Sequence, residues 1–206
     1  MKPIFNDYQK KLSDIILENN AISPLSELYS NEIRELAVVW SYYSEKIEGN
    51  TYSFVETETL LKDGITSAKK FEDAKMLKNL YNTFIAELQH IKSGNKEVID
   101  KRFLMQMHSQ LLDELVDDRE RSIIRKRALR IAGSDYVPLA SPTAIEESLD
   151  HIIAQQANLS NPLERAVYLH CNIAKLQPFI DGNKRTARLT ESVVLMNEDI
   201  IPKFST

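Results

Sequence analysis

The stretch Leu176–Arg188, LQPFIDGNKRTAR, decides the fold of the C-terminal part of this 206-residue chain. Pro178 and Gly182 interrupt the helical pattern, so the stretch predicts a loop between a helix at about residues 161–176 and another at about 184–197. The first N–H groups of a helix have no partner within it and carry partial positive charge. The start of the second helix is therefore a candidate site for an anion such as phosphate.

The basic residues of the stretch fit the same interpretation. Arg185 and Arg188 are three positions apart, so they share a helical face on which two guanidinium groups can bind successive phosphates. Gly182 allows close approach of the backbone, and Asp181 suits Mg²⁺, which takes one or two carboxylates with phosphate oxygens. On the residues alone, a solvated basic face with the glycine as a helix stop remains an equal alternative. A Walker-type P-loop is excluded, because no G-x-x-x-x-G-K-(S/T) occurs in the chain.

Bulk composition narrows the class of protein. With 43% hydrophobic and 27% charged residues, the chain is typical of a soluble globular protein and forms one compact unit. A net charge of −4 argues against direct nucleic-acid binding. The single cysteine, Cys171, excludes an intrachain disulfide and fits a reducing compartment. No apolar run approaches the ~18–20 residues of a membrane span. We therefore expect a cytoplasmic protein that does not enter a membrane.

The rest of the chain predicts an all-α fold with one exception. Apolar spacing indicates helices at about residues 25–47, 53–63, 71–91 and 143–157, with further apolar helical faces at 12–16 and 103–115. Ser53 with Glu56, and Thr143 with Glu146, are predicted capping boxes. Residues 128–138, ALRIAGSDYVP, combine β-forming residues with a Gly-Ser-Asp turn and predict a short β-hairpin flap.

Residues 177–188, QPFIDGNKRTAR, resemble the motif H-x-F-x-(D/E)-G-N-(G/K)-R-x-x-R of the Fic (Fic/Doc) family. Every defining position matches except the first, where Gln177 stands in place of the histidine. The preceding AVYLHCNIAKL resembles the helix before the family's loop, and RIAGSDYVP resembles its flap, which aligns target segments. The resemblance covers roughly residues 40–200 and implies a Fic-type helical bundle. It assigns the target-aligning role to Ile131, Gly133, Ser134 and Tyr136.

A second stretch, SEKIEGN at residues 44–50, resembles the family's inhibitory motif (S/T)-x-x-x-E-(G/N). The resemblance implies an N-terminal inhibitory helix in residues 1–50, ahead of a Fic core in residues 51–206, with Ser44, Glu48, Gly49 and Asn50 as inhibitory residues. Ser44 and Glu48 share a helical face. A carboxylate delivered to Arg188 would neutralise the guanidinium expected to hold the γ-phosphate of ATP. Taken alone, the stretch is equally a helix C-terminus ended by a glycine.

The resemblance also implies a chemistry. Family members typically move AMP from Mg·ATP onto a Ser, Thr or Tyr hydroxyl of a target protein, and they often form homodimers. Carried over, Asp181 holds Mg²⁺, and the phosphate pocket is formed by Gly182, Asn183, Lys184, Arg185 and Arg188. The family's histidine removes the proton of the target hydroxyl. Gln177 cannot accept that proton usefully, so efficient transfer is not expected.

Two other functions stay open at this point. Without the base, the chain could be a pseudoenzyme that binds a nucleotide or a partner. Lys184 is shared with the Doc-type branch, whose members bind ATP in reverse and phosphorylate their targets. AMP transfer ranks above phosphorylation, because Doc-like proteins are shorter and lack the inhibitory helix. Among the other histidines, His170 is interpreted as structural and His108 as a surface or core-edge residue.

Overall fold

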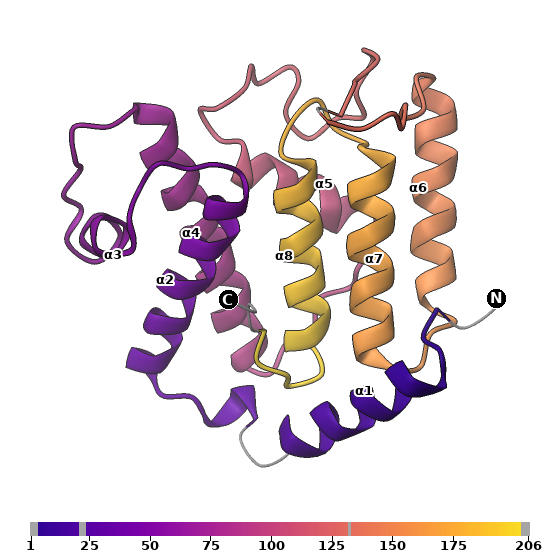
Figure 1. Cartoon of the computed structure of the whole chain (residues 1–206), viewed down its shortest axis with the longest axis horizontal. Coiled ribbons are helices and arrows are strands. Elements are labelled where there is room, and N and C mark those ends of the chain that lie inside the picture. The colour runs from indigo at the N-terminus through magenta and orange to yellow at the C-terminus, as the bar shows by residue number, and fades with distance from the viewer. Residues whose placement is uncertain (1–3, 21–23, 132, 203–206) are drawn as a thin grey trace.

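The computed structural model describes residues 4–20, 24–131 and 133–202. Within these ranges it contains eight α-helices, one short 3-10 helix and no β-strand. In chain order these are α1 (Asp7–Asn20), η1 (Leu25–Glu27), α2 (Ser30–Ile47), α3 (Phe54–Asp63), α4 (Phe71–Lys92), α5 (Lys101–Leu111), α6 (Pro142–Gln156), α7 (Pro162–Leu176) and α8 (Asn183–Met196) (Figure 1). The prediction of an all-α fold is confirmed.

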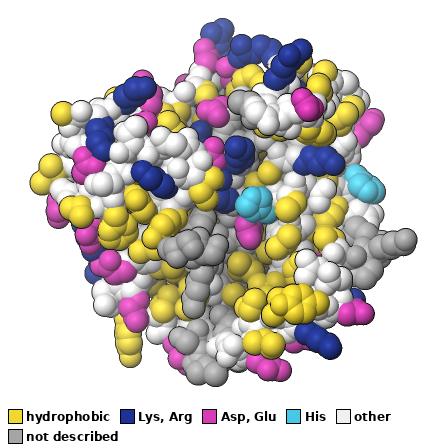
Figure 2. All heavy atoms as spheres, viewed as in Figure 1, with side chains coloured by type: hydrophobic (Ala, Val, Ile, Leu, Met, Phe, Trp, Pro, Cys, Tyr) yellow, Lys and Arg dark blue, Asp and Glu magenta, His cyan; other side chains and the backbone are white. Residues whose placement is uncertain are grey.

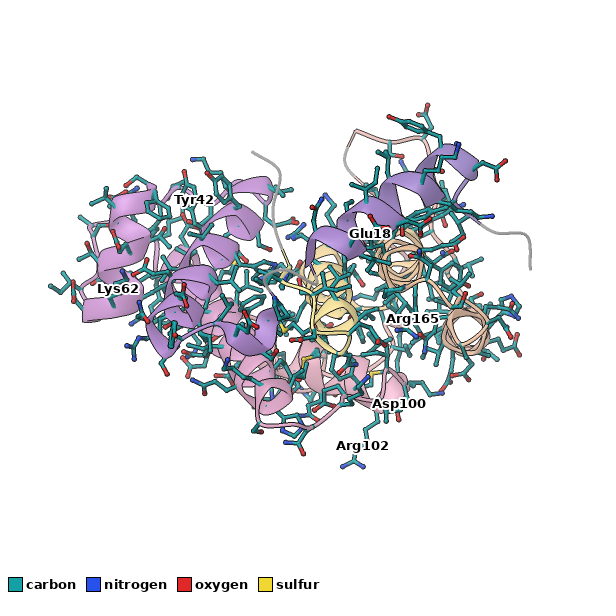
Figure 3. The ribbon with its side chains drawn as sticks, turned by 90° about the horizontal axis from the view of Figure 1, so that it is seen from below. Glu18, Tyr42, Lys62, Asp100, Arg102 and Arg165 are labelled. Atoms are coloured by element: carbon teal, nitrogen blue, oxygen red, sulfur yellow. The ribbon has the colours of Figure 1, made fainter. Side chains whose placement is uncertain are left out.

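Helix α8 occupies the middle of the molecule. In Figure 1, α6, α7 and α8 stand side by side, α2 and α4 stand on the other side of α8, and α3 is outermost. Figure 3 shows α8 end on, between the helices that carry Tyr42 and Lys62 and the helix that carries Arg165. Helix α1 crosses one end of this arrangement, and the α7–α8 loop lies at the other. No helix within the described ranges has both the length and the apolar character needed to cross a membrane.

The main hydrophobic core joins α2 to the rest of the chain. Buried side chains of α2 pack in one cluster with those of α4, α5, α6, α7 and α8. The rings of Trp40 in α2 and Phe84 in α4 stack with their centroids 4.3 Å apart. A smaller cluster, which includes Tyr52 and Leu60, holds α3 against α4. The end of α2 is thereby fixed close to α8, where the inhibitory motif was predicted to act.

Helix starts follow local capping. Ser53 and Glu56 form the predicted capping box at α3. At α6 the cap is Ser141, which accepts a hydrogen bond from the Ala144 N–H at 3.4 Å, so the predicted capping box of Thr143 with Glu146 was wrong. Pro142 explains the shift, because proline suits the first position of a helix.

The N-terminal helices differ from expectation in two ways. Helix α2 begins at Ser30, not near Leu25, because Leu25–Glu27 form the separate 3-10 helix η1. The Lys92 ammonium group binds the backbone oxygens of Ser26 in η1 and of Leu28 after it. Helix α1 forms, but its predicted apolar face is exposed at the side chains Leu12, Ile15 and Ile16. One polar contact joins it to the start of α7, where Nδ2 of Asn161, the residue that caps α7, donates to Ser13 Oγ.

The predicted β-hairpin at residues 128–138 is absent from the described residues, and Ala132 lies outside them. The chain makes one turn there, in which the Ser134 N–H donates to the Ile131 oxygen at 3.2 Å. Pro138 is the one residue buried among those described in this segment. A two-stranded hairpin without a buried face is marginal in water. The described residues of the flap therefore form a loop.

Glu87 of α4 leads to a prediction about stability. Its side chain is buried, and burial, helped by the like charge of Glu97, raises its pKa from 4.5 to about 7. The folded chain keeps a proton that the unfolded chain releases, so this group lowers stability as the pH rises from about 4.5 to about 7. We expect Glu87→Gln to raise the free energy of unfolding by about 1–3 kcal/mol at pH 8 and to change it little at pH 4.5. Urea unfolding checks this, and an equal effect at both pH values would contradict it.

Candidate anion-binding site

The loop between α7 and α8 is closed by two residues in the left-handed backbone region. Gln177 ends α7 with φ 51° and ψ 60°, and its N–H donates to the Ile173 oxygen at 3.1 Å. Gly182 precedes α8 with φ 69°. These two conformations reverse the chain, so α8 runs back along α7 with its N-terminus open at the end of the molecule.

Gly182 is required there for two reasons. Its positive φ disfavours any residue with a Cβ. A Cβ at this position would also lie 2.3 Å from Cδ2 of Leu112, a fully buried side chain. The backbone at the start of α8 therefore lies directly on the core.

Asn183 holds the loop in shape. Its Oδ1 accepts from the Phe179 N–H at 2.8 Å, and its Nδ2 donates to the Phe179 oxygen at 2.9 Å. Both polar atoms of the buried side chain are engaged in these bonds. Asn183 can therefore offer a ligand its backbone N–H, while its side chain fixes the loop.

His108 supports the α7–α8 loop from its buried side, a role that sequence reasoning missed. Its ring is fully buried and stacks on Phe179 with centroids 3.9 Å apart. Because the Ser122 N–H donates to Nδ1 at 2.9 Å, the ring proton sits on Nε2, which donates to the Asp181 oxygen at 3.2 Å. Burial, partly offset by the Asp181 oxygen, lowers the pKa of His108 to about 4. The prediction of a surface or core-edge residue was wrong, although the spacing of Leu104, His108 and Leu111 places all three on one buried face.

Arg125 ties the loop to the flap and was also missed. Its side chain is 2% exposed. Nε donates to the Gln177 oxygen at 2.7 Å, and the two Nη atoms donate to the backbone oxygens of Arg127 and Leu139. Its own N–H donates to the Pro178 oxygen at 3.0 Å. Burial lowers the pKa of Arg125. This arginine is thus occupied with backbone oxygens and is not available to a ligand.

The structure brings most of the predicted site residues together. A pocket of about 180 Å³ lies over the N-terminus of α8, and its lining includes Gln177, Asp181, Gly182, Asn183, Lys184 and Arg185. Glu48 and two flap residues, Leu129 and Arg130, complete one side. The predicted target-aligning residues Ile131, Gly133, Ser134 and Tyr136 do not line this pocket. The Tyr136 ring instead has the Lys175 ammonium 5.5 Å from its centroid.

Arg188 lies one turn further along α8 and borders a second pocket. This opening of about 510 Å³ is also lined by Lys184, His170 and Glu191, and His170 Nδ1 is paired with the Glu191 carboxylate. Figure 2 shows basic side chains beside a histidine and an acidic side chain near the centre of this face. Lys184 is exposed and borders both pockets, so its ammonium group can serve a ligand in either.

Asp181 has the exposure and the neighbours that a Mg²⁺ ligand needs. Its side chain is 62% exposed, and one oxygen is 3.2 Å from Nη2 of Arg185. The other oxygen accepts from the Gly182 N–H at 2.6 Å. Mg²⁺ commonly takes one carboxylate and completes its shell with phosphate oxygens and water. Within the described ranges, no group of three or more His, Cys, Asp and Glu side chains could hold a metal ion without such help.

The predicted inhibitory helix reaches Arg188 directly. Nε of Arg188 donates to Ser44 Oγ at 2.8 Å, and Nη2 donates to Glu48 Oε1 at 2.7 Å and to the Ser44 oxygen at 3.2 Å. Gly49, with φ 86°, follows the end of α2. Asn50 turns the other way, and its Nδ2 donates to the Asp73 oxygen at 2.9 Å. Ser44 and Glu48 therefore contact the arginine, while Gly49 and Asn50 shape the end of the helix.

Comparison with known proteins agrees with this geometry. Residues 98–195 match the Fic/DOC family. The Protein adenylyltransferase Fic of Drosophila mojavensis is 24% identical over 208 residues, which cover 95% of this chain and 40% of that protein. The Protein adenylyltransferase fic-1 of Caenorhabditis elegans is 26% identical over 182 residues, which cover 82% and 34%. The chain thus spans about two fifths or less of the length of these relatives.

Solved structures have the same fold. A Fic family protein from Desulfovibrio desulfuricans G20 aligns with a TM-score of 0.78 and 20% identity over 96% of this chain and 61% of its own. Fic-1 of C. elegans, residues 134–508, aligns with a TM-score of 0.74 and 23% identity over 98% and 60%. Residues 98–195, which include the loop and its basic helix start, thus match a Fic/DOC family domain, and the chain has the fold of these solved structures.

Proposed function

We propose that this chain is a Fic-fold protein adenylyltransferase, which transfers AMP from Mg·ATP to a hydroxyl group of a target protein, and that α2 inhibits it. The observation that carries the proposal is the position of Arg188. A buried guanidinium at the start of α8, beside a pocket of phosphate-binding character, is held by Glu48 and Ser44 of another helix. The names of the relatives, protein adenylyltransferases, support the reaction type.

The start of α8 and three side chains on or next to it have roles in this reaction. The N–H groups at the start of α8 donate hydrogen bonds to phosphate oxygens, and the helix dipole strengthens this binding. Arg185 and Arg188 bind the β- and γ-phosphates bidentately. Asp181 is the residue that would hold Mg²⁺, whose charge stabilises the pyrophosphate that leaves. The target hydroxyl oxygen attacks the α-phosphorus, the bond to the α,β-bridging oxygen breaks, and the hydroxyl proton goes to a base.

Position 177 is where that base is expected, and Gln177 cannot take the proton. Its Nε2 donates to the Ala174 oxygen at 2.6 Å. His108 does not replace it, because both ring nitrogens are bonded and the ring is buried. His170 faces the neighbouring pocket, where it pairs with Glu191. The pocket and the two arginines still position ATP and stabilise the negative charge of its phosphates, and a bound Mg²⁺ would add to this stabilisation. The unaltered chain is therefore a slow transferase.

The inhibitory contact acts on the nucleotide. While Glu48 and Ser44 hold Arg188, the γ-phosphate lacks its guanidinium, and ATP that enters the pocket is not aligned for transfer. The flap residues Ile131, Gly133, Ser134 and Tyr136 align the target segment outside the pocket. We also propose that the chain meets its target protein in the cytoplasm and that it forms a homodimer.

The position of the transferred label distinguishes this function from its two rivals. The variant Gln177→His/Glu48→Gly is incubated with Mg·ATP labelled at the α- or the γ-phosphate, and lysate proteins are scored. AMP transfer incorporates the α-label alone. Incorporation of the γ-label alone shows Doc-like phosphorylation, which exposed Lys184 favours. Tight binding of Mg·ATP without any incorporation shows a nucleotide-binding pseudoenzyme.

A further inference from the structure

Glu45 is a buried carboxylate that the inhibitory motif does not include. It lies on α2 between Ser44 and Glu48, and its side chain is fully buried. Neither carboxylate oxygen has a hydrogen-bond partner. The nearby Asn50 amide donates to the Asp73 oxygen at 2.9 Å and acts only weakly on the Glu45 carboxylate. Such a group is costly to bury, and its position therefore calls for an explanation.

Arg185 of α8 is the positive charge that we pair with Glu45. It is 5% exposed, and its Nη2 pairs with Asp181 on the solvent side. Its Nη1 is buried and has no hydrogen-bond partner. One half of the guanidinium thus faces the open pocket, and the other half faces the interior of the protein.

The two helices present their charges with the same spacing. Glu45 and Glu48 are three residues apart on α2, and Arg185 and Arg188 are three residues apart on α8, so each pair lies on one face. Burial raises the pKa of Glu45, and the largest opposing effects come from Arg185 and then Arg188. Glu48 adds to the effect of burial, and Asn50 slightly opposes it. Arg185 is therefore the main positive charge acting on Glu45.

We propose that Glu45 is a second inhibitory carboxylate, which neutralises Arg185 through space as Glu48 neutralises Arg188 by direct contact. The inference rests on the proposed function, because it assumes that Arg185 binds a phosphate of ATP. Two carboxylates, Glu45 and Glu48, then inhibit nucleotide binding, and removing Glu48 frees only Arg188. Full release requires that Glu45 be removed, protonated or carried away with α2.

Protonation of Glu45 predicts a pH dependence of Mg·ATP binding that a residue with a purely structural role would not cause. A nucleotide phosphate at Arg185 adds negative charge beside Glu45 and raises the affinity of this carboxylate for a proton. Binding of Mg·ATP to the unaltered chain is therefore linked to proton uptake and tightens as the pH falls. Glutamine at position 45 cannot take up that proton, so this part of the pH dependence disappears.

Calorimetric titration with Mg·ATP at pH 8 and pH 6 tests the inference. The full chain is compared with Glu45→Gln, Glu48→Gly and the double variant, and Glu87→Gln is the matched control, a buried carboxylate away from the pocket. At pH 8 we expect Glu45→Gln to tighten binding roughly tenfold, the size expected for one partly screened neighbouring charge. The double variant binds more tightly than Glu48→Gly, the gain from Glu45→Gln shrinks at pH 6, and Glu87→Gln leaves the affinity unchanged.

Two outcomes would overturn the inference, and only the second would also overturn the proposed function. If Glu48→Gly tightens binding while Glu45→Gln changes neither the affinity nor its pH dependence, Glu45 is not inhibitory and the proposed function stands. If no variant binds Mg·ATP, the proposed function fails and the inference fails with it. Urea unfolding verifies that each variant folds. Where Glu45→Gln is too unstable, Glu45→Met, which has similar volume and no charge, must give the same tightening.

Discussion

Histidine at position 177 will raise AMP transfer about 10²–10⁴-fold in the Glu48→Gly background, the usual contribution of a positioned general base. The backbone at this position is suited to the exchange. Its φ of 51° lies in the left-handed region, where histidine is among the better tolerated residues. The residue's carbonyl oxygen is held by Arg125, so the new imidazole starts from the same anchored loop.

The measurement is the initial rate of α-label incorporation into target protein at saturating Mg·ATP. Gln177→Asn is the matched control, since it keeps an amide in the same place and should leave the rate at the background level. The pH profile of the histidine variant should rise with the deprotonation of an imidazole. Equal rates for the glutamine and histidine forms would show that position 177 does not supply the base.

Gly182→Ala will lower the free energy of unfolding by about 2–4 kcal/mol, because two costs add. The first is backbone strain at φ 69°, and the second is the overlap of the new Cβ with Cδ2 of Leu112, 2.3 Å away in the core. Gly64→Ala is the control for strain alone. Gly64 has φ 74°, and nothing lies within 4 Å of its Cβ position, so that variant should lose only about 1 kcal/mol.

Urea unfolding of the two alanine variants separates strain from overlap. The difference between them measures the contact between the start of α8 and the core. Equal losses would mean that Leu112 moves aside at no cost and that the loop does not rest on a rigid support. A larger loss at Gly182 should be accompanied by weaker Mg·ATP binding, because the same backbone forms the floor of the pocket.

Local signals in the sequence were enough to predict much of the fold and the contact of Ser44 and Glu48 with Arg188. Pro178 and Gly182 marked the loop, and Ser53 with Glu56 marked the start of α3. The spacing of Ser44 and Glu48 indicated that both could face one partner, and both contact Arg188. These features depend on residues a few positions apart, which is the range over which helical geometry determines position.

Features that depend on distant parts of the chain escaped prediction. Arg125 stands in the run Arg-Lys-Arg, and it differs from its exposed neighbours by its burial and by bonds to distant residues, such as the one to the Gln177 oxygen 52 positions away. The flap had strand-forming residues, but the described part of the chain offers no strand for them to pair with. The apolar face of α1 had the right spacing but no surface that covers it in the described part of the chain. In each case tertiary contacts outweighed local preference.

The affinity for Mg·ATP, compared between the unaltered chain and Glu48→Gly, tests the central claim most directly. The claim is that α8 forms a phosphate site and that α2 closes it through Arg188. We expect binding to tighten roughly tenfold or more on removal of the carboxylate, because a charge-assisted pair at 2.7 Å must otherwise be broken. The gain should vanish when Arg188 is also replaced by alanine, which closes a double-mutant cycle. Unchanged affinity in Glu48→Gly, or the same gain without Arg188, would contradict the claim.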